Sequence, residues 1–311
     1  MGRLVVVSNR VADPRKTASG GLAVALGQAL QASGGLWFGW SGKVVEGGTP
    51  GEGDVHLQTA GPVQLATVDL SREDHDSYYL GYSNGVLWPV FHYRLDLADF
   101  DAGFIGGYRR VNQMFAHKLA AMLRPDDVIW VHDYHLIPLA AELRAMGCEQ
   151  RMGFFLHVPL PPPLMLAALP EHDWLMRSLF AYDLVGFQSQ TDVTHFERYA
   201  SDELRAQWVG QHGWHAFGKT LQVRAFPIGI DVDEFQALGE GKDAREMFEH
   251  WQSFEDYVKT YGLERSEAVL LRHLSEVYKV LSQTVPPSMK TEELIEAEAF
   301  FEDILRNVDS S

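Results

Sequence analysis

Short apolar runs that end in polar residues recur along the first two thirds of the chain. Their length and β-branched content are typical of buried strands. Helical patterns lie between them, as over residues 136–146, so we predict a parallel α/β sheet with ligand-binding groups at the carboxyl ends of the strands. The runs are residues 4–7, which lead into Ser8-Asn9-Arg10, residues 128–131 before His132, residues 153–156 before His157 and residues 184–187 before Gln188.

Two glycine-rich segments interrupt this alternation. Residues 34–42 contain four glycines and two tryptophans, a composition that disfavours a helix interior and predicts a hairpin or compact loop. Residues 45–55 are polar and glycine-rich, which predicts a mobile surface loop.

The pattern changes after about residue 236. Glycine becomes rare, acidic residues dominate, and three amphipathic helices are predicted at 243–261, 266–283 and 291–307. We therefore predict a Rossmann-like domain over residues 1–236 and an acidic α-helical tail over residues 237–311. The tail resembles no family that we can name.

Several segments carry candidate binding chemistry, each with a structural alternative. Arg10 follows a strand, and Ser19-Gly20-Gly21 opens a helical pattern whose free N–H groups favour a phosphate; an ordinary strand-to-helix turn has the same pattern. Residues 78–89 are rich in tyrosine and tryptophan, which cover the apolar faces of sugars but also fill cores.

Histidines and an aspartate follow two of the predicted strands. His132-Asp133-Tyr134-His135 contains metal-ligand types, but three residues of extended chain would splay the two imidazoles, so we expect no metal and favour Asp133 as an acceptor for ligand hydroxyls. His157 is placed to reach the same crevice, or simply to cap its strand.

Composition narrows the possible partners. The chain has 311 residues and a net charge of −16, which disfavours nucleic acid while leaving room for a small phosphate pocket. No apolar run is long enough to span a membrane, so we do not expect a membrane as a partner. Cys148, the only cysteine, and the absence of a signal-peptide pattern favour the cytoplasm. A homo-oligomer is compatible with the sequence.

Eight sequence blocks, in order, resemble the trehalose-6-phosphate synthases, retaining glycosyltransferases with the GT-B fold. The resemblance covers residues 1 to about 236, the acceptor-side half of that fold. The blocks are Leu4-Val5-Val6-Val7-Ser8-Asn9-Arg10, Gly20-Gly21-Leu22, residues 35–42, Val86-Leu87-Trp88-Pro89 with residues 91–94, residues 130–136, residues 153–157, residues 183–188 and Pro227-Ile228-Gly229-Ile230-Asp231.

The resemblance implies a role for each matched residue. Arg10 would bind the phosphate of glucose 6-phosphate. The acceptor sugar would be lined by Trp40, Tyr79, Trp88 and Asp133, with Tyr79 also reaching the phosphate. Gly21 would approach the diphosphate of UDP-glucose, and His157 would contact the transferred glucose. Asp133 and His157 would stand at the reacting centre in binding and orienting roles, with no general base assigned and no metal or cofactor needed.

The resemblance also implies the reaction, glucosyl transfer from UDP-glucose to glucose 6-phosphate in trehalose biosynthesis. Residues after 236 do not match the family's donor-binding domain, so we expect weak or absent UDP-glucose binding and impaired transfer. The alternative is a catalytically inactive sugar-phosphate-binding or structural module. A related glycosyltransferase with another acceptor is a third option, which the presence of Arg10 disfavours.

Overall fold

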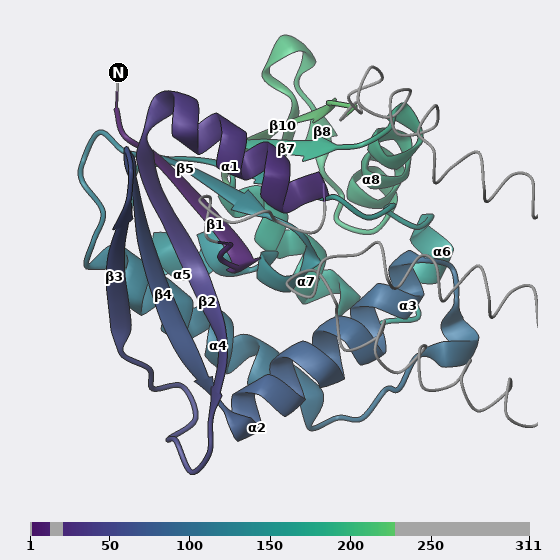
Figure 1. Ribbon diagram of the computed structural model, residues 1–311. Helices are drawn as coiled ribbons and strands as arrows, with labels where there is room; N and C mark the ends of the chain where they lie inside the picture. Colours follow the sequence, from purple (N-terminus) through teal and green to yellow (C-terminus); the bar gives the residue numbers. More distant parts are fainter. Residues whose placement is uncertain (1, 13–20, 228–311) are drawn as a thin grey trace, which may run out of the picture. The chain divides into compact units, whose positions relative to one another are not determined.

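The computed structural model describes residues 2–12 and 21–227, which form an α/β fold around a mixed sheet (Figure 1). In this part of the chain the sheet has ten strands in the order β3-β4-β2-β1-β5-β6-β7-β10-β9-β8. The seven neighbouring strands β4, β2, β1, β5, β6, β7 and β10 pair in parallel. Strand β3 is added antiparallel at one edge of the sheet, and β9 and β8 are added antiparallel at the other. The predicted parallel α/β sheet is therefore confirmed. The predicted helical tail, residues 237–311, lies outside the described residues.

The strand and helix bounds follow the chain order. The strands are β1 (Leu4–Arg10), β2 (Gly35–Val45), β3 (Val55–Ala60), β4 (Val63–Ser71), β5 (Val128–His132), β6 (Arg151–Phe155), β7 (Leu184–Phe187), β8 (Gln207–Trp208), β9 (Trp214–Ala216) and β10 (Lys219–Ala225). The helices are α1 (Gly21–Ser33), α2 (Arg72–Asp74), the π-type η1 (His75–Leu87), α3 (Trp88–Phe91), η2 (Leu95–Leu97), α4 (Phe104–Ala120), η3 (Tyr134–Leu136), α5 (Leu139–Ala145), α6 (Pro163–Leu166), α7 (His172–Ser178), η4 (Leu179–Ala181), α8 (Gln190–Asp202) and η5 (Gly210–His212).

All four strands predicted from short apolar runs are present. They are β1, β5, β6 and β7, and they lie side by side in the sheet with β1, β5 and β6 adjacent. The helix predicted over 136–146 is present as α5, shortened at both ends. Because the strands are parallel, the polar residues at the carboxyl ends of β1, β5 and β6 lie on the same side of the sheet, where all these strands end.

The prediction of a hairpin or loop over residues 34–42 is wrong, because most of this segment belongs to strand β2. Strand β2 lies between β1 and β4 in the middle of the sheet, and its pattern of burial is that of a core strand. Its glycines fit this place: a Cβ on Gly39 would clash with the carbonyl oxygen of Ser8 on β1. Glycine here serves the close approach of a neighbouring main chain and not a turn.

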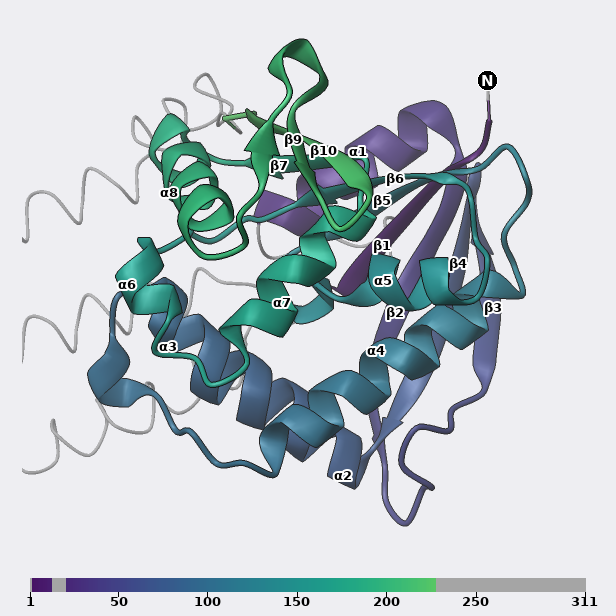
Figure 2. The same cartoon turned by 180° about the vertical axis from the view of Figure 1, so that it is seen from behind.

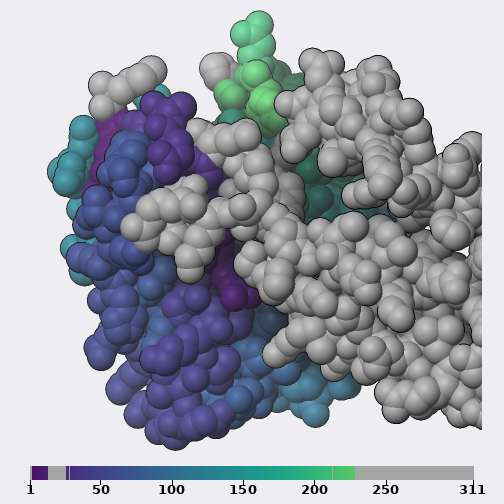
Figure 3. All heavy atoms as spheres, in the orientation of Figure 1, coloured from purple at the N-terminus to yellow at the C-terminus, as the bar shows by residue number. Residues whose placement is uncertain are grey.

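The loop predicted over residues 45–55 lies between β2 and β3, with its ends taken up by the strands. Strand β3 exposes most of its side chains, as expected at a sheet edge, and this flank of the molecule forms the blue-violet surface in Figure 3.

The helices cover both faces of the sheet. Helices α4, α5 and α7 lie on one face, seen in Figure 2, and α1 lies on the opposite face in Figure 1. The larger buried cluster joins the first face to these helices, while a smaller cluster joins α1 to Val6, Trp37 and Leu65. Successive strand residues thus alternate between two cores, as Val6 and Val7 do.

Candidate functional site

Asp133 and His157 lie where β5 and β6 end. The main-chain N–H of Asp133 donates to the carbonyl oxygen of Phe155 at 2.8 Å, which ties the two strand ends together. Oδ1 of Asp133 accepts the main-chain N–H groups of Tyr134, at 3.1 Å, and of His157, at 3.3 Å. Asp133 and His157 therefore lie next to each other, and main-chain hydrogen bonds hold the two strand ends together.

The electrostatic environment of these two residues is unusual for surface groups. Burial raises the pKa of Asp133 to about 6, although its main-chain hydrogen bonds act in the opposite direction. Burial lowers the pKa of His157 to about 4, and burial together with His157 holds the pKa of His132 well below its ordinary value. At neutral pH the site therefore presents a carboxylate beside neutral imidazoles.

The backbone of Asp133 has an uncommon conformation. Its φ is 73° and its ψ is 165°, a region that glycine occupies readily and other residues avoid. The side chain compensates in part, since it accepts the N–H of the next residue and begins the short helix η3. The turn brings the carboxylate to the main-chain N–H of His157, just after β6.

Arg10, Trp40 and Tyr79 form a second group at the same edge of the sheet. The guanidinium carbon of Arg10 lies 5.8 Å from the ring centroid of Trp40, and the Trp40 and Tyr79 centroids lie 5.4 Å apart. Gly42 makes room for the cation, since a Cβ there would lie 2.7 Å from Nε of Arg10. Trp40 is only 4% exposed, so its buried ring packs against both Arg10 and Tyr79.

Arg10 has no carboxylate partner among the residues that the structure describes, and its side chain is exposed. A guanidinium that is held against an aromatic ring and has no carboxylate partner in the described part of the chain is suited to bind a phosphate or carboxylate group of a ligand.

His135 links the two groups. Its ring stacks on Tyr79, with centroids 5.9 Å apart and planes at 17°, and on Tyr134, with centroids 4.0 Å apart. Burial lowers the pKa of His135 to about 3, and neither ring nitrogen has a hydrogen-bond partner within the described ranges. His135 was not predicted as a site residue. The signal for it is its place two residues after Asp133.

Two predicted residues are less closely tied to this arrangement. Trp88 begins α3, nine residues after Tyr79, and stacks on His92 with centroids 4.2 Å apart; the described contacts do not join it to Asp133 or Arg10. Gly21 is the first residue of α1, as expected of a helix N-terminus, while the preceding Ser19 and Gly20 lie outside the described residues.

The two histidines of the 132–135 segment contact different neighbours. Nδ1 of His132 lies 3.0 Å from Nε2 of His157, whereas His135 packs between tyrosines. Over residues 2–12 and 21–227, no group of three histidine, cysteine or carboxylate side chains is placed to hold a metal ion.

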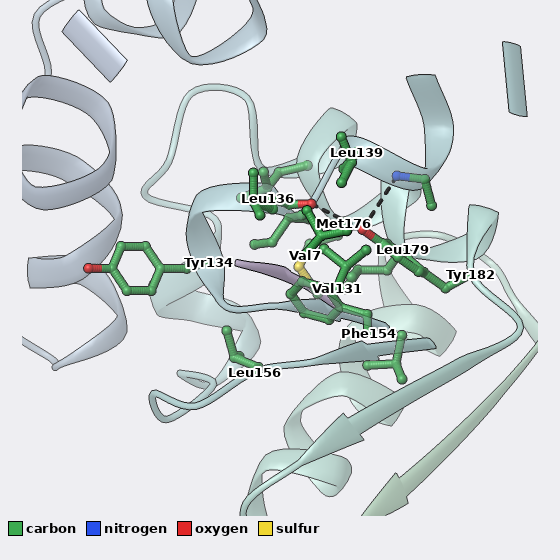
Figure 4. Close-up of a cluster of buried hydrophobic side chains, with 14 of the residues drawn as sticks. Val7, Val131, Tyr134, Leu136, Leu139, Phe154, Leu156, Met176, Leu179 and Tyr182 are labelled. Atoms are coloured by element: carbon green, nitrogen blue, oxygen red, sulfur yellow. Dashed lines mark hydrogen bonds between the residues drawn. The ribbon is translucent and has the colours of Figure 1, made fainter. Parts of the chain in front are cut away.

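The turn that carries Asp133 rests on a rigid core. Figure 4 shows the cluster beneath it, in which the Tyr182 hydroxyl donates to the carbonyl oxygen of Leu136 at 3.0 Å and accepts the N–H of Ala140 at 3.4 Å. Val7 and Val131, from β1 and β5, are fully buried in the same cluster. Packing and hydrogen bonds therefore fix the strand ends from which the site is built.

An apolar groove of about 1050 Å³ lies elsewhere on the sheet. Its lining comes from β5, β6, β7 and β10, with Trp130, Phe154 and Phe226 among the residues that contribute. None of the predicted site residues lines it, so the groove is separate from the crevice at the strand ends.

Comparison with known proteins supports the sequence resemblance. The family model for glycosyltransferase family 20 matches residues 6–259. The trehalose-6-phosphate synthase of Klebsiella pneumoniae is 46% identical over 243 residues, which are 78% of this chain and 50% of the relative. An α,α-trehalose-phosphate synthase (UDP-forming) from Burkholderia xenovorans, solved in complex with glucose-6-phosphate, is 46% identical with a TM-score of 0.73, over 81% of this chain and 56% of that one.

An E. coli structure described as trehalose-6-phosphate bound with UDP-2-fluoro glucose is 36% identical with a TM-score of 0.72, over 99% of this chain and 69% of that one. The chain spans about half the length of the curated relatives it matches. A second family model, a domain of unknown function (DUF3516), matches residues 242–311, the segment for which the sequence alone suggested no family.

The fold and these matches agree. The large, mostly parallel sheet with its covering helices is that of the GT-B trehalose-phosphate synthase structures. In the described part of the chain no helix is long and apolar enough to cross a membrane. The family model matches well over half of the chain, and the identities exceed 40% over most of it. The chain belongs to glycosyltransferase family 20.

Proposed function

We propose that this chain binds glucose 6-phosphate at the carboxyl ends of β1, β2 and β5, as the acceptor for glucosyl transfer from UDP-glucose that yields trehalose 6-phosphate. The observation that carries this proposal is the Arg10–Trp40–Tyr79 group, in which a guanidinium without a carboxylate partner among the described residues lies over the Trp40 ring, and Trp40 in turn contacts Tyr79. A cation beside aromatic rings matches a ligand that combines a phosphate with a sugar ring.

Asp133 completes the acceptor site in this proposal. Its carboxylate is held by main-chain N–H groups and has no cation partner in the described part of the chain, which leaves acceptor capacity for sugar hydroxyls. Trp88 would close the sugar site from α3. The Burkholderia xenovorans relative was solved with glucose-6-phosphate, which supports the choice of ligand.

The donor would lie between the N-terminus of α1, at Gly21, and His157. A diphosphate is stabilised by free N–H groups at a helix N-terminus, and His157 would contact the transferred glucose. The E. coli relative was solved with a UDP-glucose analogue. The described residues provide few other groups for a diphosphate, so we expect this chain by itself to transfer glucose slowly, and a sugar-phosphate-binding module is the alternative.

We further propose the division into an acceptor-side domain over residues 1–236 and a separate segment over residues 237–311. The match of the second family model from residue 242 supports a change near this point, while the glycosyltransferase model runs on to residue 259. Cytoplasmic location and homo-oligomer formation remain predictions from the sequence.

Calorimetric titration with glucose 6-phosphate tests the binding site. Arg10→Ala should weaken affinity by about 10- to 100-fold, the effect of losing a charge-assisted hydrogen bond to phosphate. Arg177→Ala is the matched control, because the Arg177 guanidinium also lies over an aromatic ring, 4.8 Å from the Phe217 centroid, but on α7. Equal loss in both variants, or no binding by the parent chain, contradicts the proposal.

Release of UDP separates the two functions. Release with both sugars present supports glucosyl transfer by this chain. Binding of glucose 6-phosphate that depends on Arg10, with no release of UDP, supports the binding module.

A further inference from the structure

His132 is the last residue of β5 and is fully buried next to the site. Its Nδ1 lies 3.0 Å from Nε2 of His157, so one of these nitrogens donates a proton and the other accepts it. Its second nitrogen, Nε2, is buried and has no partner among the residues described. The acceptor site proposed for Arg10, Trp40, Tyr79 and Asp133 does not involve this side chain.

Two neutral arrangements of the pair are conceivable. If His157 donates, His132 must carry its own proton on Nε2, and a buried N–H group is left without an acceptor. If His132 donates from Nδ1, only a lone pair is left unpaired at its Nε2. Buried N–H groups without partners are rare in proteins, whereas acceptors with spare lone pairs are tolerated more often. The second arrangement is therefore favoured.

The second arrangement fixes the proton of His157. Its Nε2 is occupied as an acceptor, so the proton of the neutral ring is on Nδ1. The side chain of His157 is partly exposed, and its Nδ1 has no hydrogen-bond partner within the described ranges. The ring therefore offers an N–H donor on the side away from His132, while the main-chain N–H of His157 is bound by the Asp133 carboxylate.

We propose that His132 is a positioning residue: its Nδ1–H group donates to Nε2 of His157 and so sets His157 as an Nδ1–H donor toward a hydroxyl group of the bound donor sugar. The sugar as ligand rests on the proposed function, whereas the proton position does not. His132 itself touches no ligand in this scheme. Its effect is to orient the ring and select the tautomer of a residue that does.

The proton position is measurable without any ligand. Two-dimensional proton–nitrogen correlation of the ¹⁵N-histidine-labelled full chain distinguishes the two tautomers of each imidazole, and His157→Gln identifies the His157 signals. We expect His157 to be protonated on Nδ1 and His132 also on Nδ1, at neutral pH. A His157 signal with the proton on Nε2 overturns the inference, whatever the ligand results.

Two substitutions test the role of the N–H group of His132. His132→Asn keeps an N–H group near the position of Nδ1, and His132→Phe keeps a ring of similar shape without one. The Asn variant should retain the Nδ1–H form of His157, and the Phe variant should lose it. If the Phe variant does not fold, the spectra of the parent and of the Asn variant still show which nitrogen of His157 carries the proton.

Titration with UDP-glucose, followed through the His157 signals, connects the proton to binding. The Phe variant should bind about five- to tenfold more weakly than the parent, as for loss of one neutral hydrogen bond, and the Asn variant within about twofold of the parent. Equal weakening in both variants contradicts the positioning role. No binding by the parent counts against the donor half of the proposed function and leaves the tautomer result to judge His132.

Discussion

The two ends of β5 carry the same residue type in opposite environments. Asp127, directly before the strand, is 2% exposed and accepts two hydrogen bonds from Arg3, at 3.0 and 2.7 Å. Burial acts to raise the pKa of Asp127, but the hydrogen bonds from Arg3 and Arg124 outweigh it and the pKa is lowered. Asp133, directly after the strand, has only main-chain partners among the residues that the structure describes, and its pKa is raised to about 6.

The two ends of β5 therefore have different roles, one in stability and one in ligand binding. At the amino end the carboxylate is neutralised by a cation and fastens β5 to the residue preceding β1. At the carboxyl end the charge is left without a cation among the described residues, in the crevice where a parallel sheet binds ligands. A buried carboxylate with spare acceptor capacity lowers the stability of the folded state, but it can accept hydrogen bonds from a ligand.

The largest effect on stability is expected at the amino end. Asp127→Asn should lower the free energy of unfolding by about 2–3 kcal/mol, because it leaves the largely buried Arg3 guanidinium without its counter-charge. Urea unfolding followed by tryptophan fluorescence measures the change. Asp126→Asn, at the exposed neighbouring position, is the control and should stay within about 0.5 kcal/mol of the parent. Equal stability of the two variants would remove the structural half of the comparison.

The same substitution at the carboxyl end should have the opposite result. Asp133→Asn keeps an oxygen to accept the main-chain N–H groups and removes a desolvated charge, so the protein should become more stable at pH 7 by about 1 kcal/mol. Affinity for glucose 6-phosphate should fall by about 10- to 100-fold. Urea unfolding and calorimetry measure the two quantities. A variant that loses stability and keeps affinity would place Asp133 among the structural carboxylates.

The pH dependence of stability should separate the two aspartates. The pKa of Asp133 is higher in the folded state, so its unfavourable contribution is present above about pH 6 and disappears as the pH falls from about 6 toward the ordinary pKa of an aspartate. The advantage of Asp133→Asn, about 1 kcal/mol at pH 7, should therefore vanish by pH 4. Asp127 has a lowered pKa, so its stabilisation is present at neutral pH and is lost only below the ordinary range of an aspartate.

His157 acts against Asp133 over part of this range. Its folded pKa of about 4 lies below the ordinary histidine value, so it stabilises the protein above pH 6.5 and this contribution is lost as the pH falls toward 4. Comparing parent and Asp133→Asn at each pH cancels the His157 contribution to first order. An unchanged difference between pH 7 and pH 4 would contradict the raised pKa of Asp133.

The smallest effect is expected from Arg3→Lys. A lysine keeps the positive charge near Asp127 but cannot supply both hydrogen bonds of the guanidinium or its bond to the Met122 carbonyl oxygen. Stability should fall by about 0.5–1 kcal/mol, and affinity for glucose 6-phosphate should not change. The urea and calorimetric measurements above are sufficient. A loss as large as that of Asp127→Asn would show that hydrogen-bond geometry, and not charge, dominates this end.

The sequence predicted the strands around the site because their signals are local. Apolar runs ending in Arg10, His132 and His157 mark buried parallel strands directly, and the ends of such strands meet at one edge. Strand β2 was missed because its glycines were interpreted as turn formers, whereas they accommodate neighbouring main chain. That neighbour, Ser8 on β1, is distant in sequence.

The details of the site depend on contacts that no local pattern contains. The stacking of His135 on Tyr79 joins residues 56 positions apart, and the His132–His157 bond joins residues 25 positions apart. The opposite pKa shifts of Asp127 and Asp133 likewise follow from their surroundings, since the residue type is the same. Residue type and order were sufficient to predict that Asp133 and His157 lie close together, but not how each is paired.

The left-handed backbone of Asp133 has a consequence for directed evolution. Glycine occupies φ 73°, ψ 165° without strain, so Asp133→Gly removes both a strained backbone and a desolvated charge. A library sorted only for thermal tolerance would therefore enrich glycine at this position, and the enriched clones would have lost the carboxylate from the crevice. Any stabilisation campaign on this scaffold needs a ligand-binding screen in parallel, or this position held constant.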